Sequence, residues 1–335
     1  MRENNLNLLR LLAALAVIVS HSFPVTLGFG AIEPLTNILG YSLGGVAVKV
    51  FFAISGLLIY RSWEESSSAQ FVLARILRLY PGLIIVSLLL AFVVGPLFTA
   101  DADYFSQPEP WNYVFETLGL PANPALLPGV FTATPYPGVN GALWTLHYEV
   151  ACYGGVALAG TLGAFRRFNI SLACYAAFFV LCEDTNYAQY SLPFVFGMAI
   201  HHYRLPLRLP ILTVLAGLTI ALYALHNPVA QCASTIAISY GALWFGLLKQ
   251  PYLAAYNRLG DYSYGVYIYG WPVQQIEVTL FPGLSPYALM ASAIPVALAC
   301  GMLSWHFVEG PMLALRKSIQ LPFLKSSHPQ RAGDR

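Results

Sequence analysis

Charged residues are scarce in this chain. Lys, Arg, Asp and Glu make up 10% of its 335 residues, whereas hydrophobic residues make up 57% and the mean hydropathy is +0.62. Soluble domains carry about 25% charged residues. The composition therefore excludes an ordinary soluble protein and indicates a polytopic membrane protein, with membrane lipid as a partner. The net charge of +2 is too small to predict binding to nucleic acid.

The chain is also poor in cysteine. The five cysteines are scattered through apolar runs and form no C-x-x-C pair: Cys152, Cys174, Cys182, Cys232 and Cys300. Scattered cysteines of this kind usually behave as small buried apolar side chains. We therefore expect neither a disulfide framework nor a bound metal.

Long apolar runs, separated by Pro, Gly, Asn and charged residues, are the dominant pattern. They predict an all-α transmembrane bundle of about ten spans, formed by residues 1–315, and the last residues, 316–335, are expected to be a disordered basic tail. The first run is expected to be retained as a span and not removed as a signal peptide. The spans are predicted at 6–23, 44–61, 79–99, 144–163, 169–183, 187–203, 209–225, 229–248, 261–281 and 287–311.

Lys and Arg are distributed unevenly among the connections between these runs. They collect in alternate connections, whereas the intervening ones hold acidic residues such as Glu33 and Glu116. The basic connections carry Arg61, Arg75 and Arg78; Arg166 and Arg167; Arg204 and Arg208; and Lys249 and Arg258. Because cytoplasmic loops are rich in Lys and Arg, we expect these connections and both termini to be cytoplasmic.

Two ionisable residues, Arg10 and His21, lie in the first apolar run. They are eleven positions apart, so a helix brings them onto one face with a rise of about 16 Å between them. Each has an ordinary explanation: Arg10 can extend to lipid headgroups, and His21 can be a satisfied polar residue near the outer surface. A pair on one face of a bundle helix instead indicates a functional path, with Arg10 at its cytoplasmic end.

The second run contains Lys49 and the stretch Phe-Phe-Ala-Ile-Ser-Gly at 51–56. Small residues such as Ser55 are typical of close helix packing. The following connection carries Arg75 and Arg78 at helical spacing, just before the expected third span. Such a pair can bind phosphate oxygens or can simply fix the membrane topology, and the sequence leaves both interpretations open.

The fourth run opens on Trp144 and Thr145 and places Glu149 about 8 Å below its outer end. A carboxylate inside a membrane needs a partner. His21, whose ring Glu149 could orient, and Lys49 are both predicted at a similar depth, and the sequence does not choose between them.

Taken in order along the chain, these motifs resemble the acyltransferase-3 family of integral membrane O-acyltransferases. The resemblance spans residues 4 to about 312. An aromatic stretch around Tyr264, which alone is typical of an interfacial belt, also matches. The matching features are Arg10 with His21, the 51–56 stretch, Arg75-x-x-Arg78-x-x-Pro81, Trp144-Thr145-Leu146-x-x-Glu149, Tyr262-Ser263-Tyr264-Gly265 and Glu309-Gly310-Pro311.

The resemblance implies transfer of an acyl group, usually acetyl, from cytoplasmic acyl-CoA to a hydroxyl of an extracytoplasmic glycan or glycolipid. The implied location is the bacterial inner membrane, with acyl-CoA as co-substrate and no metal. Arg10, Arg75 and Arg78 are expected to bind the CoA phosphates. His21 is the expected catalytic residue, as general base or as covalent acyl carrier, and Glu149 its expected partner.

Five further residues are expected to support the substrate or the site: Lys49, Ser55, Trp144, Thr145 and Tyr264. Some members of the family carry an extracytoplasmic esterase-like domain, and this chain is expected to work without one. The oligomeric state is left open.

Four aromatic residues of the long connection 100–143 can either stack on sugar rings or merely cover the bundle: Trp111, Tyr113, Phe131 and Tyr136.

A transporter or flippase for a polar solute or a lipid-linked glycan would also suit ten spans with buried charges and Gly or Pro interruptions. We find no repeat between the two halves that favours it.

Overall fold

The structure is a computed structural model that describes residues 4–36, 40–123, 126–182 and 185–319. These residues are all-helical, and they contain one isolated β-bridge, between Thr99 and Val130, but no strand. The ten longer helices that overlap the expected spans are α1 (Leu6–Leu27), α3 (Leu43–Glu65), α4 (Ser68–Leu89), α7 (Trp144–Thr161), α8 (Phe168–Leu181), α9 (Asn186–Tyr203), α10 (Leu209–Ala224), α11 (Ala230–Leu247), α13 (Ser263–Leu280) and α14 (Pro286–Ser304).

Shorter elements join or extend these helices. Two π-helical turns, at Leu90–Val94 and Trp305–Glu309, continue α4 into α5 and α14 into α15. The short helices are α5 (Gly95–Phe98), α6 (Glu109–Leu118), α12 (Pro251–Ala254) and α15 (Gly310–Ser318), and 3-10 turns lie at Tyr104–Ser106, Ala164–Arg167 and Ala255–Arg258. Because α15 ends at Ser318, it includes the first residues of the expected tail, and residues 320–335 lie outside the described part of the chain.

Five helical segments of the described residues are long and apolar enough to cross a membrane: Leu6–Leu27, Leu43–Glu65, Ser68–Phe98, Ala164–Leu181 and Pro286–Arg316. A sixth is added if Ala230–Leu247 and Pro251–Arg258, which meet at 86°, form one broken span. The other long helices are shorter or more polar. The all-helical membrane fold is thus confirmed, whereas the number of about ten spans stays a prediction.

The third span begins earlier than expected. A start at 79 is wrong, because α4 begins at Ser68, where a capping box fixes the helix N-terminus. The Ser67 hydroxyl accepts a hydrogen bond from the Gln70 N–H at 3.3 Å, and the Gln70 side-chain oxygen accepts one from the Ser67 N–H at 3.5 Å. Arg75 and Arg78 therefore lie inside a helix and not in a loop, and they need partners within the bundle.

The centre of the bundle is the contact of α3 with α9, and α1 packs against both α3 and α13. Small residues allow the α3 and α9 backbones to touch. A Cβ atom on Gly56 would overlap the Phe194 carbonyl, and one on Gly197 would overlap the Ala53 carbonyl. This is the packing that small residues permit between membrane helices, and it fixes α3, which carries Lys49 and Ser55.

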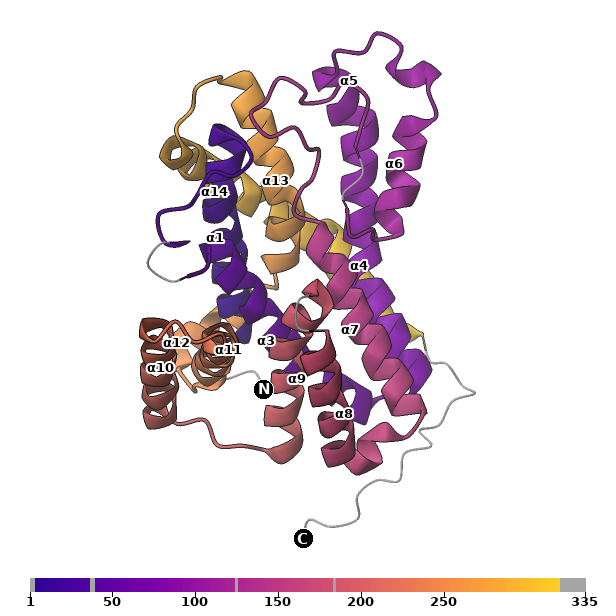
Figure 1. Ribbon diagram of the computed structural model, residues 1–335. Helices are drawn as coiled ribbons and strands as arrows, with labels where there is room; N and C mark the ends of the chain where they lie inside the picture. The colour runs from indigo at the N-terminus through magenta and orange to yellow at the C-terminus, as the bar shows by residue number, and fades with distance from the viewer. Residues whose placement is uncertain (1–3, 37–39, 124–125, 183–184, 320–335) are drawn as a thin grey trace.

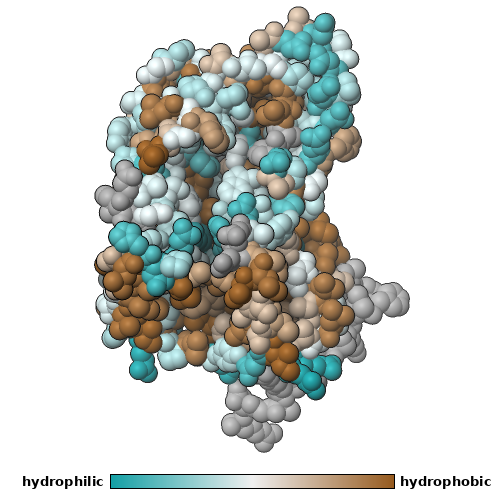
Figure 2. All heavy atoms as spheres, viewed as in Figure 1, coloured by the Kyte–Doolittle hydropathy of each residue, from teal (hydrophilic) through white to brown (hydrophobic). Residues whose placement is uncertain are grey.

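The outer surface of the bundle is apolar where a soluble protein would be polar. None of the residues of α10 is buried, and of α8 only Phe168 is. Figure 2 shows hydrophobic residues gathered over the lower half of this face, where Figure 1 places α8 and α10. Exposed apolar surface of this extent indicates contact with lipid.

The connections lie at two opposite ends of the bundle. In Figure 1, α5, α6 and the chain that leads on to α7 form the upper end, and the connection between α9 and α10 lies at the lower end. The connection between α7 and α8 also lies at the lower end. These two lower connections are among those rich in arginine, as the charge distribution predicts for a cytoplasmic side.

Replacing Gly56 by Ala tests the α3–α9 contact. The added methyl group meets the backbone of Phe194, so we expect Gly56→Ala to lower the free energy of unfolding in detergent by about 1–3 kcal/mol. Gly217→Ala in α10 is the matched control, because a Cβ there meets no atom within 4 Å. It should leave stability unchanged or raise it by up to about 1 kcal/mol. Equal thermal midpoints for the two variants would contradict the proposed contact.

Candidate active site

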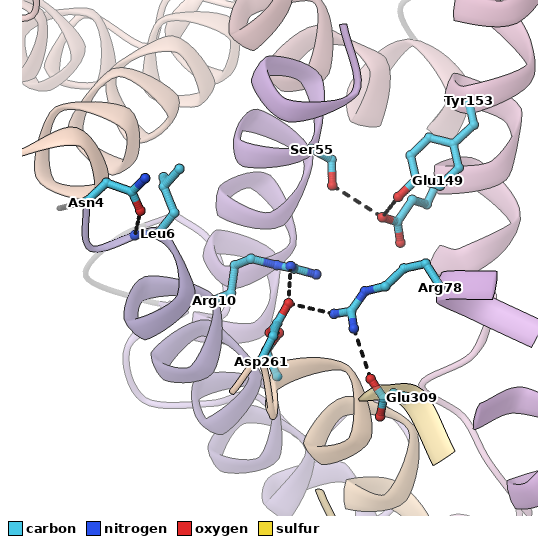
Figure 3. A network of polar contacts seen from close by, with 10 residues as sticks. Asn4, Leu6, Arg10, Ser55, Arg78, Glu149, Tyr153, Asp261 and Glu309 are labelled. Carbon is cyan, nitrogen blue, oxygen red and sulfur yellow. Dashed lines mark hydrogen bonds and ion pairs between the residues drawn. The ribbon is translucent and has the colours of Figure 1, made fainter. Parts of the chain in front are cut away.

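Two arginines from different helices meet on one carboxylate. Arg10 of α1 donates from Nη1 to Asp261 Oδ2 at 2.5 Å, and Arg78 of α4 donates from Nη2 to the same oxygen at 2.7 Å (Figure 3). Arg78 also donates from Nη1 to Glu309 Oε2 at 3.0 Å. Two carboxylates thus balance the positive charges of two guanidinium groups in the interior of the bundle.

Each carboxylate of this network is held by a serine. Ser263 donates to Asp261 Oδ1 at 2.5 Å, and Ser304 donates to Glu309 Oε1 at 2.9 Å. Glu309 is 0% exposed. Buried charges are retained where hydrogen bonds satisfy their remaining lone pairs, and this arrangement meets that condition. We refer to Arg10, Arg78, Asp261 and Glu309 as the ionic lock.

Tyr264 supports the lock from the first turn of α13. Its hydroxyl donates to the Leu79 carbonyl of α4 at 2.7 Å, and the Arg78 guanidinium carbon lies 5.4 Å from its ring centroid. Gly82 leaves room for the ring, because a Cβ there would lie 2.8 Å from a ring carbon. Tyr264 is thus a packing residue between α4 and α13, and its contacts differ from those of an interfacial aromatic belt.

Arg75 differs from its two neighbours. It forms none of the ion pairs made by the described residues, and its Nε atom is buried without a hydrogen-bonding partner among them. Its guanidinium carbon lies 5.7 Å from the ring centroids of both Phe71 and Tyr153. Arg75 lines a cavity of about 210 Å³ together with Arg10, Arg78 and Arg316. We call this the inner cavity, and its guanidinium groups are of the kind that bind phosphate oxygens.

Glu149 lies beside the inner cavity and away from both of its expected partners. It accepts a hydrogen bond from Ser55 of α3 at 3.2 Å and another from Tyr153, one turn further along α7 (Figure 3). Among the described residues, neither His21 nor Lys49 is hydrogen bonded to it. The expected contact of Glu149 with either residue is therefore not formed, because hydroxyl donors on α3 and α7 satisfy the carboxylate first.

Lys49 is 7% exposed and packs on an aromatic ring. Its Nζ atom lies 4.0 Å from the ring centroid of Tyr41, which precedes α3. An ammonium group over an aromatic face is attracted by the ring quadrupole. Lys49 thus packs against the residues that lead into α3. It lines neither the inner cavity nor the cavities that contain His21.

His21 lies between two cavities near the other end of α1. One, of about 560 Å³, is bounded by residues of the connection before α7, and the other, of about 410 Å³, by the connection between α1 and α3. We call the pair the outer cavities. The imidazole packs edge-on against Trp271, with ring centroids 4.8 Å apart. Trp271 is itself held by its indole N–H, which donates to the Gly138 carbonyl at 2.8 Å.

Trp144 and Thr145 form the wall next to His21. The Trp144 ring lines both outer cavities and packs edge-on against Tyr190 at 5.4 Å between centroids. The Thr145 hydroxyl is hydrogen bonded to Tyr267, which donates to the Ala142 carbonyl at 2.6 Å. Both residues therefore line an outer cavity together with His21.

One helix face connects the outer and inner cavities. Thr145, Glu149 and Tyr153 follow each other at intervals of four residues on α7, so they lie on one side of the helix. Thr145 lines an outer cavity, Tyr153 lines the inner one, and Glu149 lies between them along the helix. On α1, Arg10 and His21 line the corresponding two cavities, with a rise of about 16 Å between them.

Comparison with known proteins identifies the family of this chain. The family model described as an acyltransferase domain, that of acyltransferase-3, matches residues 3–306. The chain belongs to the acyltransferase-3 family. The chain is therefore an enzyme, an acyltransferase of the O-acetyltransferase class, which agrees with the resemblance carried by its motifs.

Two relatives cover nearly the whole enzyme. An O-acetyl transferase of Shigella phage Sf6 is 31% identical over 337 residues, which cover 92% of this chain and 95% of that protein. Nodulation protein 10 of Rhizobium leguminosarum bv. viciae is 28% identical over 367 residues, 95% of each chain. No solved structure matches the enzyme.

The long connection before α7 contributes one of its four candidate aromatic residues to an outer cavity. Tyr136 lines the larger cavity, with its ring 5.3 Å from that of Trp271. Tyr113 and Phe131 are each 2% exposed, so stacking on a sugar is wrong for them. Trp111 packs on Phe92 at 4.5 Å between ring centroids.

The same connection is anchored to the end of the third span. Burial raises the pKa of Tyr104 to about 12, so its hydroxyl stays protonated at neutral pH. It donates to the Ala91 carbonyl at 2.7 Å. The Thr99 hydroxyl donates to the Pro128 carbonyl, also at 2.7 Å. These two bonds tie Tyr104 and Pro128 of the connection to the end of the third span.

Asp261 and Glu309 are two residues of the candidate site that the sequence analysis did not assign. Glu309 opens the closing Glu-Gly-Pro motif, and Asp261 directly precedes the 262–265 stretch. The sequence did carry a signal for them. An arginine inside a membrane is energetically costly unless it is paired, so Arg10 and Arg78 indicate carboxylates at the same depth.

Among the described residues, no three of His, Cys, Asp and Glu are grouped as metal ligands would be.

Removing the central carboxylate tests the ionic lock. Asp261→Asn leaves two largely buried guanidinium groups short of one charge, so we expect a loss of about 3–5 kcal/mol of stability in detergent. Glu65→Gln is the matched control, because its ion pair with Arg61 is exposed and contributes at most about 1 kcal/mol. An unfolding midpoint for Asp261→Asn equal to that of Glu65→Gln would rule out a stabilising role for the lock.

Proposed function

We propose that the enzyme transfers an acetyl group from cytoplasmic acetyl-CoA to a hydroxyl of a carbohydrate or glycolipid outside the cytoplasmic membrane. One observation carries the proposal: α1 and α7 both contribute residues to the arginine-lined inner cavity and to the outer cavity that contains His21, at different levels along each helix. Family membership favours this reaction over the alternative of a transporter or flippase. Both termini and the inner cavity are assigned to the cytoplasmic side.

The inner cavity is the proposed binding site of the donor. Arg10 and Arg78 line it while engaged in the ionic lock, which orients them, and Arg75 brings a guanidinium group that the described residues leave without an ion pair. Arg75 is therefore the principal ligand proposed for a CoA phosphate, because a planar guanidinium binds phosphate oxygens bidentately. The extended pantetheine arm then bridges the rise of about 16 Å along α1 to His21.

The transfer itself needs a base at the outer end. The acceptor oxygen attacks the thioester carbonyl, a carbon–oxygen bond forms, the carbon–sulfur bond breaks, and CoA leaves as a thiolate. His21 takes the proton of the acceptor hydroxyl and returns it to the thiolate, so the products are the acetyl ester and free CoA. The edge-on contact with Trp271 holds the ring in place while leaving its nitrogens without a protein partner among the described residues.

Glu149 has a proposed role between the inner cavity and the outer cavities. Its bonds to Ser55 and Tyr153 fix the side chains that border the inner cavity. A residue in this position acts on the passage of the pantetheine arm, not on the orientation of the imidazole. Trp144 and Thr145 complete the wall beside His21, where an aromatic ring suits the apolar face of a sugar.

Replacing the histidine tests the catalytic assignment. Reconstituted His21→Ala enzyme, given acetyl-CoA and base-treated envelope polysaccharide from cells that carry the gene, should lose about 10²–10⁴-fold in transfer rate, since a positioned base contributes that much. His226→Ala, at an exposed position after α10, is the matched control. Labelled acetyl on the polysaccharide and free CoA are both measured. Wild-type rates in His21→Ala would remove His21 from the mechanism.

Comparing two donors tests the inner cavity. Acetyl-pantetheine has the reactive thioester but lacks the nucleotide phosphates of acetyl-CoA. Arg75→Ala should lower kcat/KM for acetyl-CoA by about tenfold to a hundredfold, the value of one or two charged hydrogen bonds, and leave acetyl-pantetheine unaffected. Arg61→Ala, whose partner is the exposed Glu65, is the control and should change neither. An equal loss for both donors would show that Arg75 acts on structure and not on phosphate.

A further inference from the structure

Glu33 is a buried carboxylate in the connection between α1 and α3. The residue is 5% exposed. Its Oε1 atom accepts a hydrogen bond from the N–H of Leu43, the first residue of α3, at 2.8 Å. Its Oε2 atom is buried and has no hydrogen-bonding partner among the described residues. One oxygen of the carboxylate thus has a structural role, and the other does not.

The chain folds back to bring this carboxylate to the catalytic histidine. After α1, Gly28 and Gly30 adopt positive φ angles of 96° and 88°, which residues with a side chain rarely adopt. Glu33 then lines the 410 Å³ outer cavity together with His21. Its own carbonyl accepts from the Thr36 N–H at 3.0 Å, which closes the turn. Glu33 is therefore held in the wall of the cavity in which, on the proposed function, the acceptor hydroxyl reacts.

The chemistry of the free oxygen defines what it can bind. A buried polar atom without a partner costs about 1–3 kcal/mol, and more when it is charged, so native proteins rarely retain one without a function. An ionised carboxylate only accepts hydrogen bonds. The matching ligand group is a hydroxyl. Ser20, Thr145 and Ser42 also line this cavity, so it presents a polar surface beside the apolar rings of Trp144 and Tyr190.

We propose that Glu33 is a specificity-determining residue that binds the acceptor through a second hydroxyl, so that the hydroxyl to be acetylated lies at His21. The proposal rests on the proposed function and deepens it, since it selects polyhydroxylated acceptors over simple alcohols. A site with a buried acceptor atom discriminates strongly against ligands without the matching donor, because that atom is then left unpaired.

Glu33→Gln separates this role from the structural one. The amide oxygen of Gln can still accept from the Leu43 N–H, while its NH₂ group replaces the free carboxylate oxygen by a donor. Stability and KM for acetyl-CoA should therefore match the wild type. Glu116→Gln, at an exposed position on α6, is the control for the loss of one negative charge from this side of the molecule.

Two measurements on enzyme in nanodiscs test the proposal. The first is calorimetric binding of base-treated envelope polysaccharide without donor, and the second is kcat/KM for its acetylation. Glu33→Gln should lower both about tenfold to a hundredfold, in line with the loss of a charged hydrogen bond. Glu116→Gln should leave both unchanged. Release of free CoA from acetyl-CoA in the presence of water alone should be the same in all three proteins.

The outcomes separate the two proposals. Wild-type binding and acetylation by Glu33→Gln would overturn the role of Glu33, and so would a loss accompanied by a raised KM for acetyl-CoA and a lowered unfolding midpoint. Polysaccharide binding that depends on Glu33, without acetyl transfer by the wild type, would support Glu33 and overturn the proposed function. A wild-type enzyme that does not bind the polysaccharide would overturn the inference about Glu33.

Discussion

The carboxylate of Asp261 holds the guanidinium groups of Arg10 and Arg78, and through them it joins α1, α4 and α13. Inside a bilayer a single unpaired charge is costly, so each of these three residues depends on the other two. Glu309 extends the network to the π-helical turn after α14. The positions of four helices are thus linked by one set of charges, and the inner cavity forms beside it.

The lock also determines which arginine is available to a ligand. Arg10 and Arg78 are already paired, so they give the inner cavity its shape and part of its field, while Arg75 stacks between Phe71 and Tyr153 without an ion pair among the described residues. Three arginines for which the sequence analysis expects the same role therefore have two different environments. At the other end of α1, Glu33 and His21 line the same outer cavity, and we propose one as a binding group and the other as the reacting group.

Much of this arrangement was predictable from the sequence because it depends on local periodicity. Helical spacing alone brings Arg10 and His21 onto one face, and hydropathy alone places the long helices. The partners of the charges were not predictable, because Asp261 is 251 residues from Arg10 and 183 from Arg78 in the chain. The start of α4 was missed for a related reason: two arginines suggested a loop, whereas carboxylates from distant helices allow them inside the bundle. Depth made both His21 and Lys49 candidate partners of Glu149, but depth does not tell which side of a helix faces which neighbour.

The chain of groups along α7 has a consequence for the membrane itself. A protein with a cavity toward each side of a bilayer risks becoming a conduit for protons and ions, which would dissipate an ion gradient across that bilayer. Between its two chambers this enzyme places a carboxylate whose bonds to Ser55 and Tyr153 close the interval between α3 and α7. Neighbouring rings of Phe51 and Tyr267 pack 5.9 Å apart. The contacts that border the proposed path of the donor thus also occupy the interval between the inner and outer cavities.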